Sequence, residues 1–532
     1  MSNEETCRAT LSTSLVHDME SRGIDVDLSC TILDRYNRGD FDNQATVSAE
    51  RLPGLDGDTV VDASGELSVT IPYDEAAAGL AYAGVEQSPE HFGNRDGNSI
   101  TFDHAALHRI GIHMVPGTAY GVLNGGSATS YADEKKNRGF SEALFGLFES
   151  RFERLAEQVR GRAKGLTPAY VTESGAGPSF LELKMRNLLL LARRYMKETG
   201  KPLPDGFRPM FQMTSVNNDE EIAAAYRAYR ASPVLADLIE ETGVDVTDVR
   251  TGVQPMISAY THSEEGRPKR VFDRAWGEPG RSLPLPGGHG QSFHVLADVY
   301  RGLLADGFRY AYIGNVDNLG FTVEPATLAR FALSGRPAAF EFAFRTPVDI
   351  KGGILVQDRA GALTCGDIGP AISRDEVFEA ERGGTSILFN CATGLFDLRR
   401  LVDDIERITR DLPVRFSDQD KDAGRYSQAE QVTWEVIGML DNPLILGVDK
   451  YRRFLAAKLL SETLMTSGLE LENPDYPTDP DRSKDLKHTA EKLSSGLYRA
   501  LERYYGFRTG EGEPRPLSVG ELEAKGGETL GD

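Results

Sequence analysis

The sequence predicts an α/β protein built on a mixed, mostly parallel sheet with added N-terminal and C-terminal regions. From His113 onward, short apolar runs alternate with amphipathic stretches in the order β-α-β. One apolar run ends in "YIGNVDNLG" (312–320), where Asn315, Asp317 and Asn318 are polar groups that a sheet interior accepts poorly. Open α/β sheets bind ligands at the carboxyl ends of their strands, so this cluster predicts a site.

Individual elements follow from the period of the apolar residues. Helices are expected around 15–21 and over 180–198, 295–307, 451–465 and 486–505. In the second of these, one helical face is apolar and carries Leu181, Met185, Leu188, Ala192 and Tyr195. Strands are expected over 67–73, 209–215, 310–316, 338–345 and 385–391. In 338–345 the residues Phe340, Phe342 and Phe344 alternate with Glu341, Ala343 and Arg345, which is the period of a strand.

Composition excludes several functional classes. The 59 Lys+Arg against 81 Asp+Glu give a formal charge of −22, which repels a nucleic-acid backbone, and no block of basic residues offsets it. An acidic substrate such as a phosphate therefore requires locally placed cations or a metal. No apolar run approaches the ~18 residues of a membrane span, and the polar start "MSNEETCRATLS" predicts no signal peptide. The four cysteines form no C-x-x-C pair, so we expect a reducing, cytoplasmic setting without disulfides or zinc.

A glycine pair marks the first candidate for a binding loop. In "GVLNGGSATS" (121–130), Gly125 and Gly126 follow an apolar run and permit close approach of a ligand to the backbone. Asn124 is placed to hydrogen-bond a base or to hold the turn. The alternative is a plain connecting turn. No G-x-x-x-x-G-K-[ST] sequence occurs, so a P-loop is not predicted.

Two further segments carry groups suited to a phosphate or a base. Lys164, in "RAKGLTPAYV", precedes a proline-stiffened stretch and is a compact charge able to reach a phosphate, unless it is simply solvated. In "PGGHGQSF", glycines surround His289 just before a helix, whose free amides suit an anion or a uracil-like base. His289 either contacts ligand or fills the loop. The G-x-G-x-x-G fingerprint of dinucleotide binding is not matched.

Asp317 is the candidate metal ligand. A carboxylate at a strand end suits a hard divalent cation that keeps several waters and bridges substrate phosphates. Asn315 and Asn318 then order the loop or meet ligand hydroxyls. "DIKGGILV" adds Lys351 after a strand, and Glu430 and Lys450 follow in "SQAEQVTWEV" and "GVDKYRRF".

These motifs occur in an order that resembles a known family. "LNGG", "AKGLTP", "FLEL", "MTSVNN", "GGHG", "NVDNLG", "KGGILV", "FN" and "GVDK" follow one another over residues 120–455. In this the chain resembles the UTP–glucose-1-phosphate uridylyltransferases and, more broadly, the UDP-sugar pyrophosphorylases. The resemblance implies a Rossmann-like, GT-A-like nucleotidyltransferase domain. We assign this domain to 113–440, between a mixed, partly helical region 1–112 and a mainly helical region 441–532.

The resemblance also implies a reaction and a set of site residues. UTP and a sugar 1-phosphate, expected to be glucose 1-phosphate, would give UDP-sugar and pyrophosphate by Mg²⁺-assisted in-line attack on the α-phosphorus. Asp317 corresponds to the metal ligand, and Lys164 and Lys450 to lysines on the phosphates; these three are the implied catalytic residues. The implied substrate-binding residues are Leu123, Asn124, Gly125, Gly126, Thr214, Gly288, His289, Asn315, Asn318, Lys351, Asn390 and Glu430.

Departures from the family pattern leave alternatives open. A long insertion separates Gly126 from Lys164, so Lys135 or Lys136 could be the phosphate contact instead. "FNCATG" stands where the family has "FNTNN", which leaves N-acetylhexosamine or galactose 1-phosphate as alternative substrates. A metal-dependent glycosyltransferase and a non-catalytic nucleotide-sugar-binding homologue are alternatives of other classes. The oligomeric state is not predicted.

Overall fold

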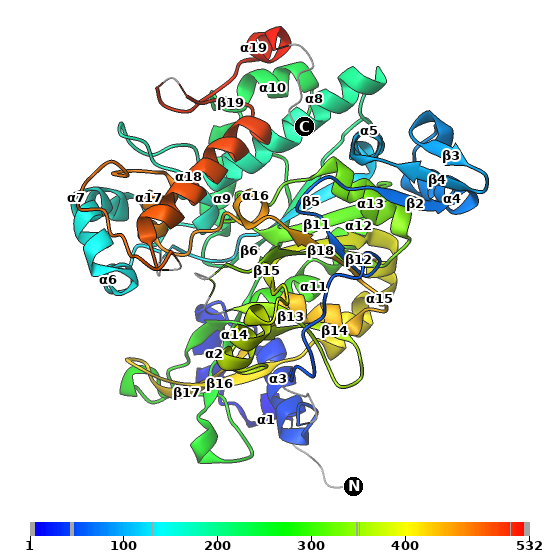
Figure 1. The fold of residues 1–532 in the computed structure, drawn as a ribbon. Coiled ribbons are helices and arrows are strands. Elements are labelled where there is room, and N and C mark those ends of the chain that lie inside the picture. Colours follow the sequence, from blue (N-terminus) through cyan, green and yellow to red (C-terminus); the bar gives the residue numbers. More distant parts are fainter. Residues whose placement is uncertain are drawn as a thin grey trace.

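A ten-stranded sheet forms the centre of the molecule in the computed structural model (Figure 1). Along its main path the strands lie in the order β1 (Val60–Asp62), β18 (Leu444–Val448), β12 (Ala338–Phe344), β15 (Leu388–Asp397), β11 (Tyr310–Asn315), β5 (Thr118–Leu123), β6 (Met210–Ser215) and β7 (Arg250–Gln254). β13 (Gly353–Gln357) and β14 (Leu363–Asp367) attach beside β15. The structure describes residues 6–42, 47–128, 131–346, 349, 352–482, 484–510 and 512–525.

The sheet is mostly parallel, as the sequence predicts. β15 runs antiparallel to β11 and β12. The other neighbouring pairs of the main path are parallel. In β5, β6, β7 and β11 the carboxyl ends therefore meet at one edge, and Leu123 pairs with both Asn315 and Met213 there. This edge positions the candidate site.

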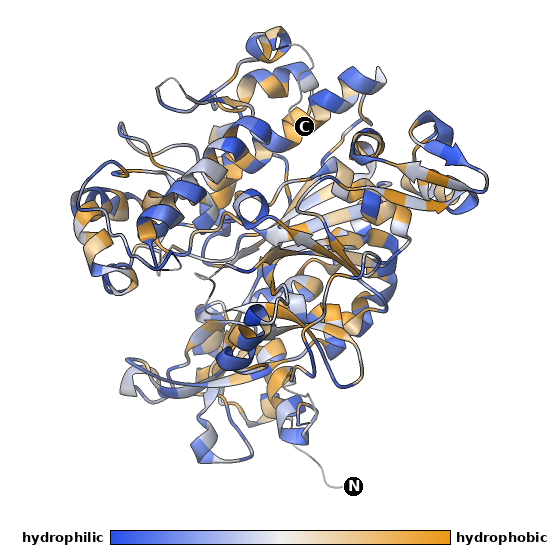
Figure 2. Ribbon diagram, viewed as in Figure 1, coloured by the Kyte–Doolittle hydropathy of each residue, from blue (hydrophilic) through white to orange (hydrophobic). Residues whose placement is uncertain are grey.

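Both faces of the sheet are buried, which explains why its strands are nearly all apolar. In β11, Tyr310 and Tyr312 belong to the core on one face, and Ala311 and Ile313 to the core on the other. The alternation expected in 338–345 is present in β12, but its polar member Glu341 is fully buried and pairs with an arginine. Figure 2 shows apolar residues along the central strands and polar residues on the outer sides of the helices.

One face is covered by helices from distant parts of the chain. Helix α8 forms where the apolar stripe predicts it. It begins at a Ser179–Glu182 capping box and ends at Gly200, which has φ +66°. It packs in one core with its neighbours. The helices of this face are α4 (Tyr73–Ala83), α5 (His104–His113), α8 (Phe180–Thr199), α13 (Pro325–Ser334) and α18 (Leu486–Arg503).

The opposite face is covered by a second core. α15 carries buried Leu398, Leu401, Ile405 and Ile408 at helical spacing. The elements on this side are α11 (Ser292–Val295), α12 (Ala297–Ala305), α15 (Leu398–Asp411) and η7 (Thr433–Met439).

The first helices pack beside two small sheets, β10-β8 and β16-β17-β9, rather than on the main one (Figure 1). Their apolar residues form one cluster with Tyr260, Val414 and Ala429. The elements involved are α1 (Cys7–Thr10), α2 (Thr13–Ser21), α3 (Val26–Arg38), β8 (Met256–Ser258), β9 (Tyr260–Thr261), β10 (Pro284–Pro286), β16 (Arg415–Lys421) and β17 (Gly424–Glu430).

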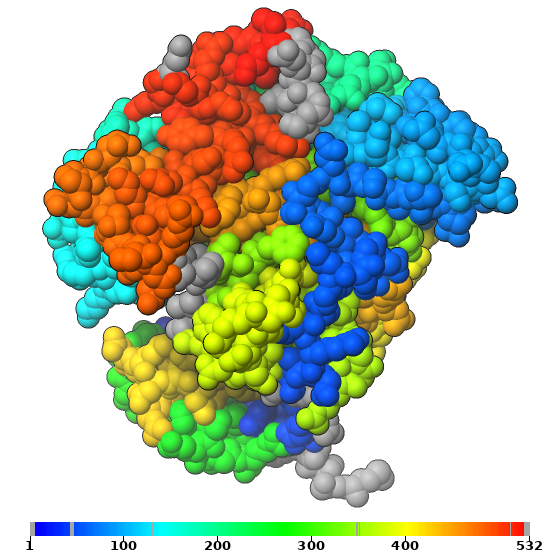
Figure 3. All heavy atoms as spheres, in the orientation of Figure 1, coloured from blue at the N-terminus to red at the C-terminus, as the bar shows by residue number. Residues whose placement is uncertain are grey.

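The insertion between Gly126 and Lys164 forms α6 (Glu134–Phe140) and α7 (Glu142–Val159), which pack with α17 (Leu460–Thr466) in a core of their own. Figure 3 shows a recess between these segments, coloured cyan and orange, and the yellow strands β16 and β17 below them.

The remaining elements are β2 (Val69–Pro72), η1 (Pro89–His91), β3 (Asn94–Asp96), β4 (Ser99–Phe102), η2 (Val115–Gly117), η3 (Lys164–Leu166), α9 (Asp219–Tyr229), α10 (Ala236–Thr242), η4 (Ser263–Glu265), η5 (Ala275–Gly277), η6 (His289–Gln291), α14 (Arg374–Arg382), α16 (Lys450–Arg453), β19 (Phe507–Arg508), β20 (Arg515–Pro516) and α19 (Val519–Ala524).

Two sequence-based expectations need comment. The helix expected over 451–465 is two short helices, α16 and α17. The residues between them pair with Asn318, whose side-chain Oδ1 accepts from the amide of Leu455 at 3.0 Å.

The domain division expected at 112/113 and 440/441 stays a prediction, although β1 and β18 from the outer regions both join the central sheet. Within the described ranges, no helix is long and apolar enough to cross a membrane.

Candidate functional site

A pocket of about 580 Å³ lies at the edge where β5, β6, β7 and β11 end. It is the place that the polar cluster after β11 predicts. Its lining residues come from six separate parts of the chain: Leu123, Gly125, Gly126, Ser127, Gly161, Lys164, Met213, Ser215, Asn217, Asn218, Gln254, Met256, Pro286, Gly288, His289, Asn315, Val316 and Asp317. Eight residues selected from the sequence are therefore brought together: Leu123, Gly125, Gly126, Lys164, Gly288, His289, Asn315 and Asp317.

The glycine loop after β5 lies against the lysine segment. The amide of Lys164 donates to the carbonyl of Gly126 at 3.0 Å, and Ser127 forms a bridge with Ala163. A side chain at Gly125 would come within 3.0 Å of Gln254 Oε1, whereas the space beside Gly126 is open for at least 4 Å. Gly126 thus exposes its backbone to the pocket, as a loop that approaches a ligand must.

Lys164 and Asp317 form an ion pair inside the pocket. Their side chains are 18% and 12% exposed, so both charges are largely withdrawn from water. Asp317 follows the end of β11, and Lys164 lies in η3, 153 residues earlier in the sequence. Lys135 and Lys136 are exposed on α6, and neither is among the described residues that line the pocket, whereas Lys164 is.

The loop that carries Asp317 is held by buried groups. Lys184, fully buried on α8, donates to the carbonyls of Asn318 and Phe321, the second at 2.6 Å. Burial lowers the pKa of Lys184 well below its ordinary value. Arg453 accepts a hydrogen bond at its carbonyl from Asn318 Nδ2 at 3.0 Å. The position of Asp317 therefore depends on α8 and α16.

His289 lines the pocket as a neutral ring. Burial, with a smaller effect of Lys458, lowers the pKa of His289 to about 4. Its Nδ1 accepts from the backbone amide of Thr433 at 3.1 Å, so the ring proton belongs on Nε2, where it is available to donate. The preceding Gly288 has φ +82°, and a side chain there would meet the carbonyl of Gln431 at 2.3 Å, so this position requires glycine.

Five predicted substrate-binding residues do not line the pocket. Each has at least one side-chain polar atom that is hydrogen-bonded within the protein. Asn124 Oδ1 accepts from Gly165, Thr214 Oγ1 donates to Asp219, Asn318 holds residues 320, 453 and 455, Asn390 Oδ1 accepts from Ala392, and Glu430 accepts from Gln428. Asn124 and Asn318 therefore position the glycine loop and the Asp317 loop, and the five predicted substrate contacts stay predictions.

Lys450 also lies outside the residues that line the pocket. It is buried on α16, forms an ion pair with Asp349 and donates to Thr346 Oγ1 at 3.1 Å. The structure does not join it to Lys164 and Asp317. Lys351 lies outside the described residues.

Several residues of the pocket were not selected from the sequence. Ser215 ends β6, Asn217 and Asn218 follow it, and Gln254 ends β7. Asn218 Nδ2 donates to the carbonyl of Asn124 at 3.0 Å and thereby links this loop to the glycine loop. The available signal was the polar end of "MTSVNN", which follows its strand as "NVDN" follows β11.

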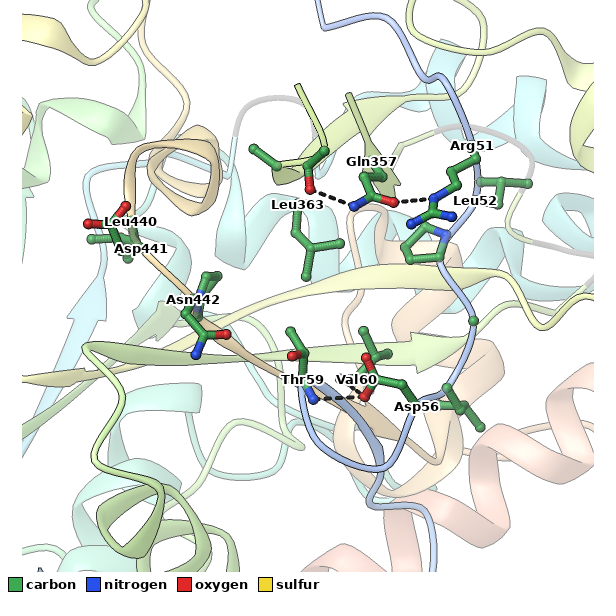
Figure 4. A pocket seen from close by; sticks show the side chains of 16 residues that line it. Arg51, Leu52, Asp56, Thr59, Val60, Gln357, Leu363, Leu440, Asp441 and Asn442 are labelled. Atoms are coloured by element: carbon green, nitrogen blue, oxygen red, sulfur yellow. Dashed lines mark hydrogen bonds between the residues drawn. The ribbon is translucent and has the colours of Figure 1, made fainter. Parts of the chain in front are cut away.

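A second, larger hollow of about 640 Å³ lies at the opposite edge, beside the starts of β1 and β18 (Figure 4). Its main polar groups are already engaged. Arg51 donates to Gln357, Gln357 donates to the carbonyl of Gly361, and Asp56 accepts from three backbone amides. Among the described residues that line it, one is basic, Arg51, and two are acidic, Asp56 and Asp441. It therefore suits a polyanion less well than the pocket at the carboxyl edge, where one lysine faces one aspartate.

The donor set of the carboxyl-edge pocket fits a metal that is shared with a substrate. Asp317 is its lining carboxylate, with the amide oxygens of Asn217 and Asn315 as further hard donors. In the part of the chain that the structure describes, no group of three His, Cys, Asp or Glu side chains converges. Mg²⁺ requires no such group, because it binds through one or two carboxylates together with waters and substrate phosphates.

Comparison with known proteins agrees with the motifs. Residues 274–488 match the model of the family described as UTP–glucose-1-phosphate uridylyltransferase. This segment is similar to that family. The family resemblance predicted from the motifs is thereby confirmed, although the glycine loop and Lys164 lie before the matched segment.

Curated relatives carry the same name. The chain is 27% identical over 192 residues to a probable UTP–glucose-1-phosphate uridylyltransferase of Schizosaccharomyces pombe, a match that covers 36% of this chain and 32% of the relative. It is 27% identical over 225 residues to the UTP–glucose-1-phosphate uridylyltransferase of Encephalitozoon cuniculi, covering 41% of this chain and 44% of the relative. The chain thus spans less than half the length of the curated relatives it matches.

Solved structures share the fold. A mutant UDP-glucose pyrophosphorylase of Leishmania major in complex with UDP-glucose aligns with a TM-score of 0.52 at 16% identity, covering 87% of this chain and 79% of that one. A UDP-glucose phosphorylase of Trypanosoma brucei aligns with a TM-score of 0.51 at 17% identity, covering 85% and 77%. The predicted α/β fold of nucleotidyltransferase type is confirmed.

Proposed function

We propose that this chain is a uridylyltransferase that converts UTP and a sugar 1-phosphate, most simply glucose 1-phosphate, into UDP-sugar and pyrophosphate. The observation that carries the proposal is the meeting of Lys164 and Asp317 in one pocket beside the Gly125–Gly126 loop. The family of residues 274–488 and the names of the curated relatives support it.

The chemistry requires positioning and charge more than a base. A sugar 1-phosphate is largely dianionic near neutral pH, since the second pKa of a phosphate monoester is ~6. Its oxygen can attack the α-phosphorus of UTP directly, and the barrier lies in aligning two polyanions and stabilising the leaving pyrophosphate. Lys164 is the pocket's ammonium group and would bind these phosphates. The Gly125–Gly126 loop and neutral His289 Nε2–H would bind and orient the nucleotide.

A divalent cation, for which we propose Mg²⁺, would be held by Asp317 and would neutralise phosphate charge when bound. Without substrate, Asp317 and Lys164 neutralise each other. On binding, both groups would exchange this contact for substrate partners, so neither charge would be left uncompensated in a partly buried site. Lys450, paired with Asp349, would need to leave that partner to reach a phosphate.

Release of pyrophosphate from UTP tests the proposal. We expect release that depends on a sugar 1-phosphate and on Mg²⁺, measured with glucose, galactose, N-acetylglucosamine and N-acetylgalactosamine 1-phosphates. The best substrate identifies the sugar. Release of UDP from a UDP-sugar would indicate a glycosyltransferase instead, and nucleotide-sugar binding without turnover would indicate a non-catalytic homologue.

A further inference from the structure

A small cationic pocket lies between α16 and α18, apart from the residues of the candidate site. Its volume is about 210 Å³. Three arginines line it, Arg452 from α16 and Arg499 and Arg503 from α18, together with the hydroxyl-bearing Ser64, Tyr451 and Tyr504. Of the described residues that line it, Asp449 is the one carboxylate, and its Oδ1 already accepts from the backbone amide of Arg452 at 3.0 Å.

The geometry of α18 creates this pocket. Gly496, Arg499 and Arg503 follow one another at spacings of three and four residues, so they share one helical face. A side chain at position 496 would meet the carbonyl of Tyr451 at 2.3 Å, so glycine lets α18 approach α16 closely. The two arginines that follow then lie beside Arg452.

Such a concentration of cations is unexpected in a chain with a formal charge of −22. Within the described residues, no carboxylate lies within ion-pair distance of Arg499, which is exposed and whose Nε donates to the carbonyl of Ser495 at 3.3 Å. Arg452 donates to Tyr504 OH at 2.9 Å and lies 3.7 Å from the buried Glu324 carboxylate. The positive charge of the pocket is therefore only partly compensated.

We propose that this pocket binds a small phosphate-class dianion. Guanidinium groups match phosphate oxygens in forked pairs, and a phosphate carries about −1.5 to −2 charges at pH 7. A volume of about 210 Å³ is below the range of about 300–1,000 Å³ that holds larger organic ligands. It suits inorganic phosphate or the head of a phosphate monoester rather than a nucleotide.

The pocket is connected to the candidate site through α16. Arg452 precedes Arg453, whose carbonyl accepts from Asn318 beside Asp317, and Lys450 belongs to the same short helix. An anion bound at Arg452 would thus contact the element that holds the Asp317 loop.

Isothermal titration calorimetry of the full chain with inorganic phosphate, at constant ionic strength, tests the proposal. We expect saturable binding of one phosphate at this pocket, separate from any phosphate bound at the candidate site. Arg499→Gln should weaken it about tenfold or more, because it removes hydrogen bonds between charged groups. Arg499→Lys, which keeps the charge but loses the fork, should bind with intermediate affinity. Lys487→Gln removes one charge from α18 away from the pocket and should bind phosphate as the unchanged chain does.

Lys164→Gln separates this proposal from the proposed function, because phosphate binding at the candidate site would be lost in that variant and binding at α18 would not. Glycerol 3-phosphate in place of phosphate distinguishes a monoester site from a free-phosphate site. The proposal is overturned if Arg499→Gln binds phosphate within twofold of the unchanged chain, if Lys164→Gln abolishes the binding, or if no saturable binding occurs up to about 10 mM.

Discussion

The buried ion pair of Glu341 and Arg453 offers the sharpest test of how the site is supported. Glu341 is 0% exposed and Arg453 is 3% exposed. Arg453 Nη2 lies 2.7 Å from Glu341 Oε1, its Nε lies 3.1 and 3.2 Å from the two oxygens, and its Nη1 donates to Thr322 Oγ1 at 2.9 Å. Glu341→Leu keeps the side-chain size but leaves the guanidinium buried without its carboxylate.

We expect Glu341→Leu to lower the free energy of unfolding substantially. Removing one partner of a buried pair costs about 3–5 kcal/mol, because the remaining charge is uncompensated. Replacing both partners, as in Glu341→Leu with Arg453→Met, removes that charge, so the double variant should be more stable than Glu341→Leu alone. Recovery will be incomplete because the two hydrogen bonds of Arg453 to Thr322 are also lost, at about 1.5–3 kcal/mol each at most.

Urea unfolding of both single variants and the double variant measures the coupling free energy. Glu341→Gln serves as the matched control, since it keeps the shape and one acceptor but not the charge, and it should lie between the unchanged chain and Glu341→Leu. Two results would refute the argument that desolvation dominates this pair. One is a double variant whose loss of unfolding free energy equals the sum of the two single losses. The other is a loss below about 1 kcal/mol for Glu341→Leu.

Three further predictions concern residues that line the pocket of the candidate site. Lys164→Ala should lower kcat for pyrophosphate release about 10²-fold or more, because it removes one preorganised charge, whereas Lys135→Ala on α6 should turn over normally. Asp317→Asn should weaken activation in a titration with Mg²⁺; an unchanged Mg²⁺ dependence would reject its role as ligand. Because the pKa of His289 is about 4 in the folded chain against 6.5 when unfolded, the unfolded state binds more protons between these values and stability falls as the pH falls. Between pH 7.5 and 5 we expect a loss of about 2 kcal/mol in urea unfolding that His289→Gln does not show.

The fold was largely predictable because its strands are buried on both faces. Strands β6, β11 and β12 and helices α8 and α18 occur where the apolar periods place them. The direction of β15 was not predictable, because an apolar run carries no information on whether its neighbours run parallel or antiparallel. Nor did the sequence indicate that β1, a three-residue strand within a turn-rich region, would extend the central sheet.

The parts of the candidate site that were predictable are those where a charged residue or a glycine pair directly follows a strand or lies in a loop. Asp317, Lys164 and the Gly125–Gly126 loop converge as expected. Lys450 does not join them, because its position depends on a partner that the motif does not name. In a chain with 81 acidic residues, each lysine has many possible carboxylate partners, and only the fold shows that Lys450 meets Asp349.

The difference between Thr214 and its neighbours shows what register adds to a motif. Met213 and Ser215 line the pocket, whereas Thr214 is fully buried and donates to Asp219. Alternate residues of a strand point to opposite faces, so choosing Thr214 rather than Ser215 from "MTS" selects the side of β6 that faces away from the pocket. The pairing of Leu123 with Met213 places Met213 beside the glycine loop. The side that faces a ligand therefore follows from strand period and register together, and a polar residue type alone does not determine it.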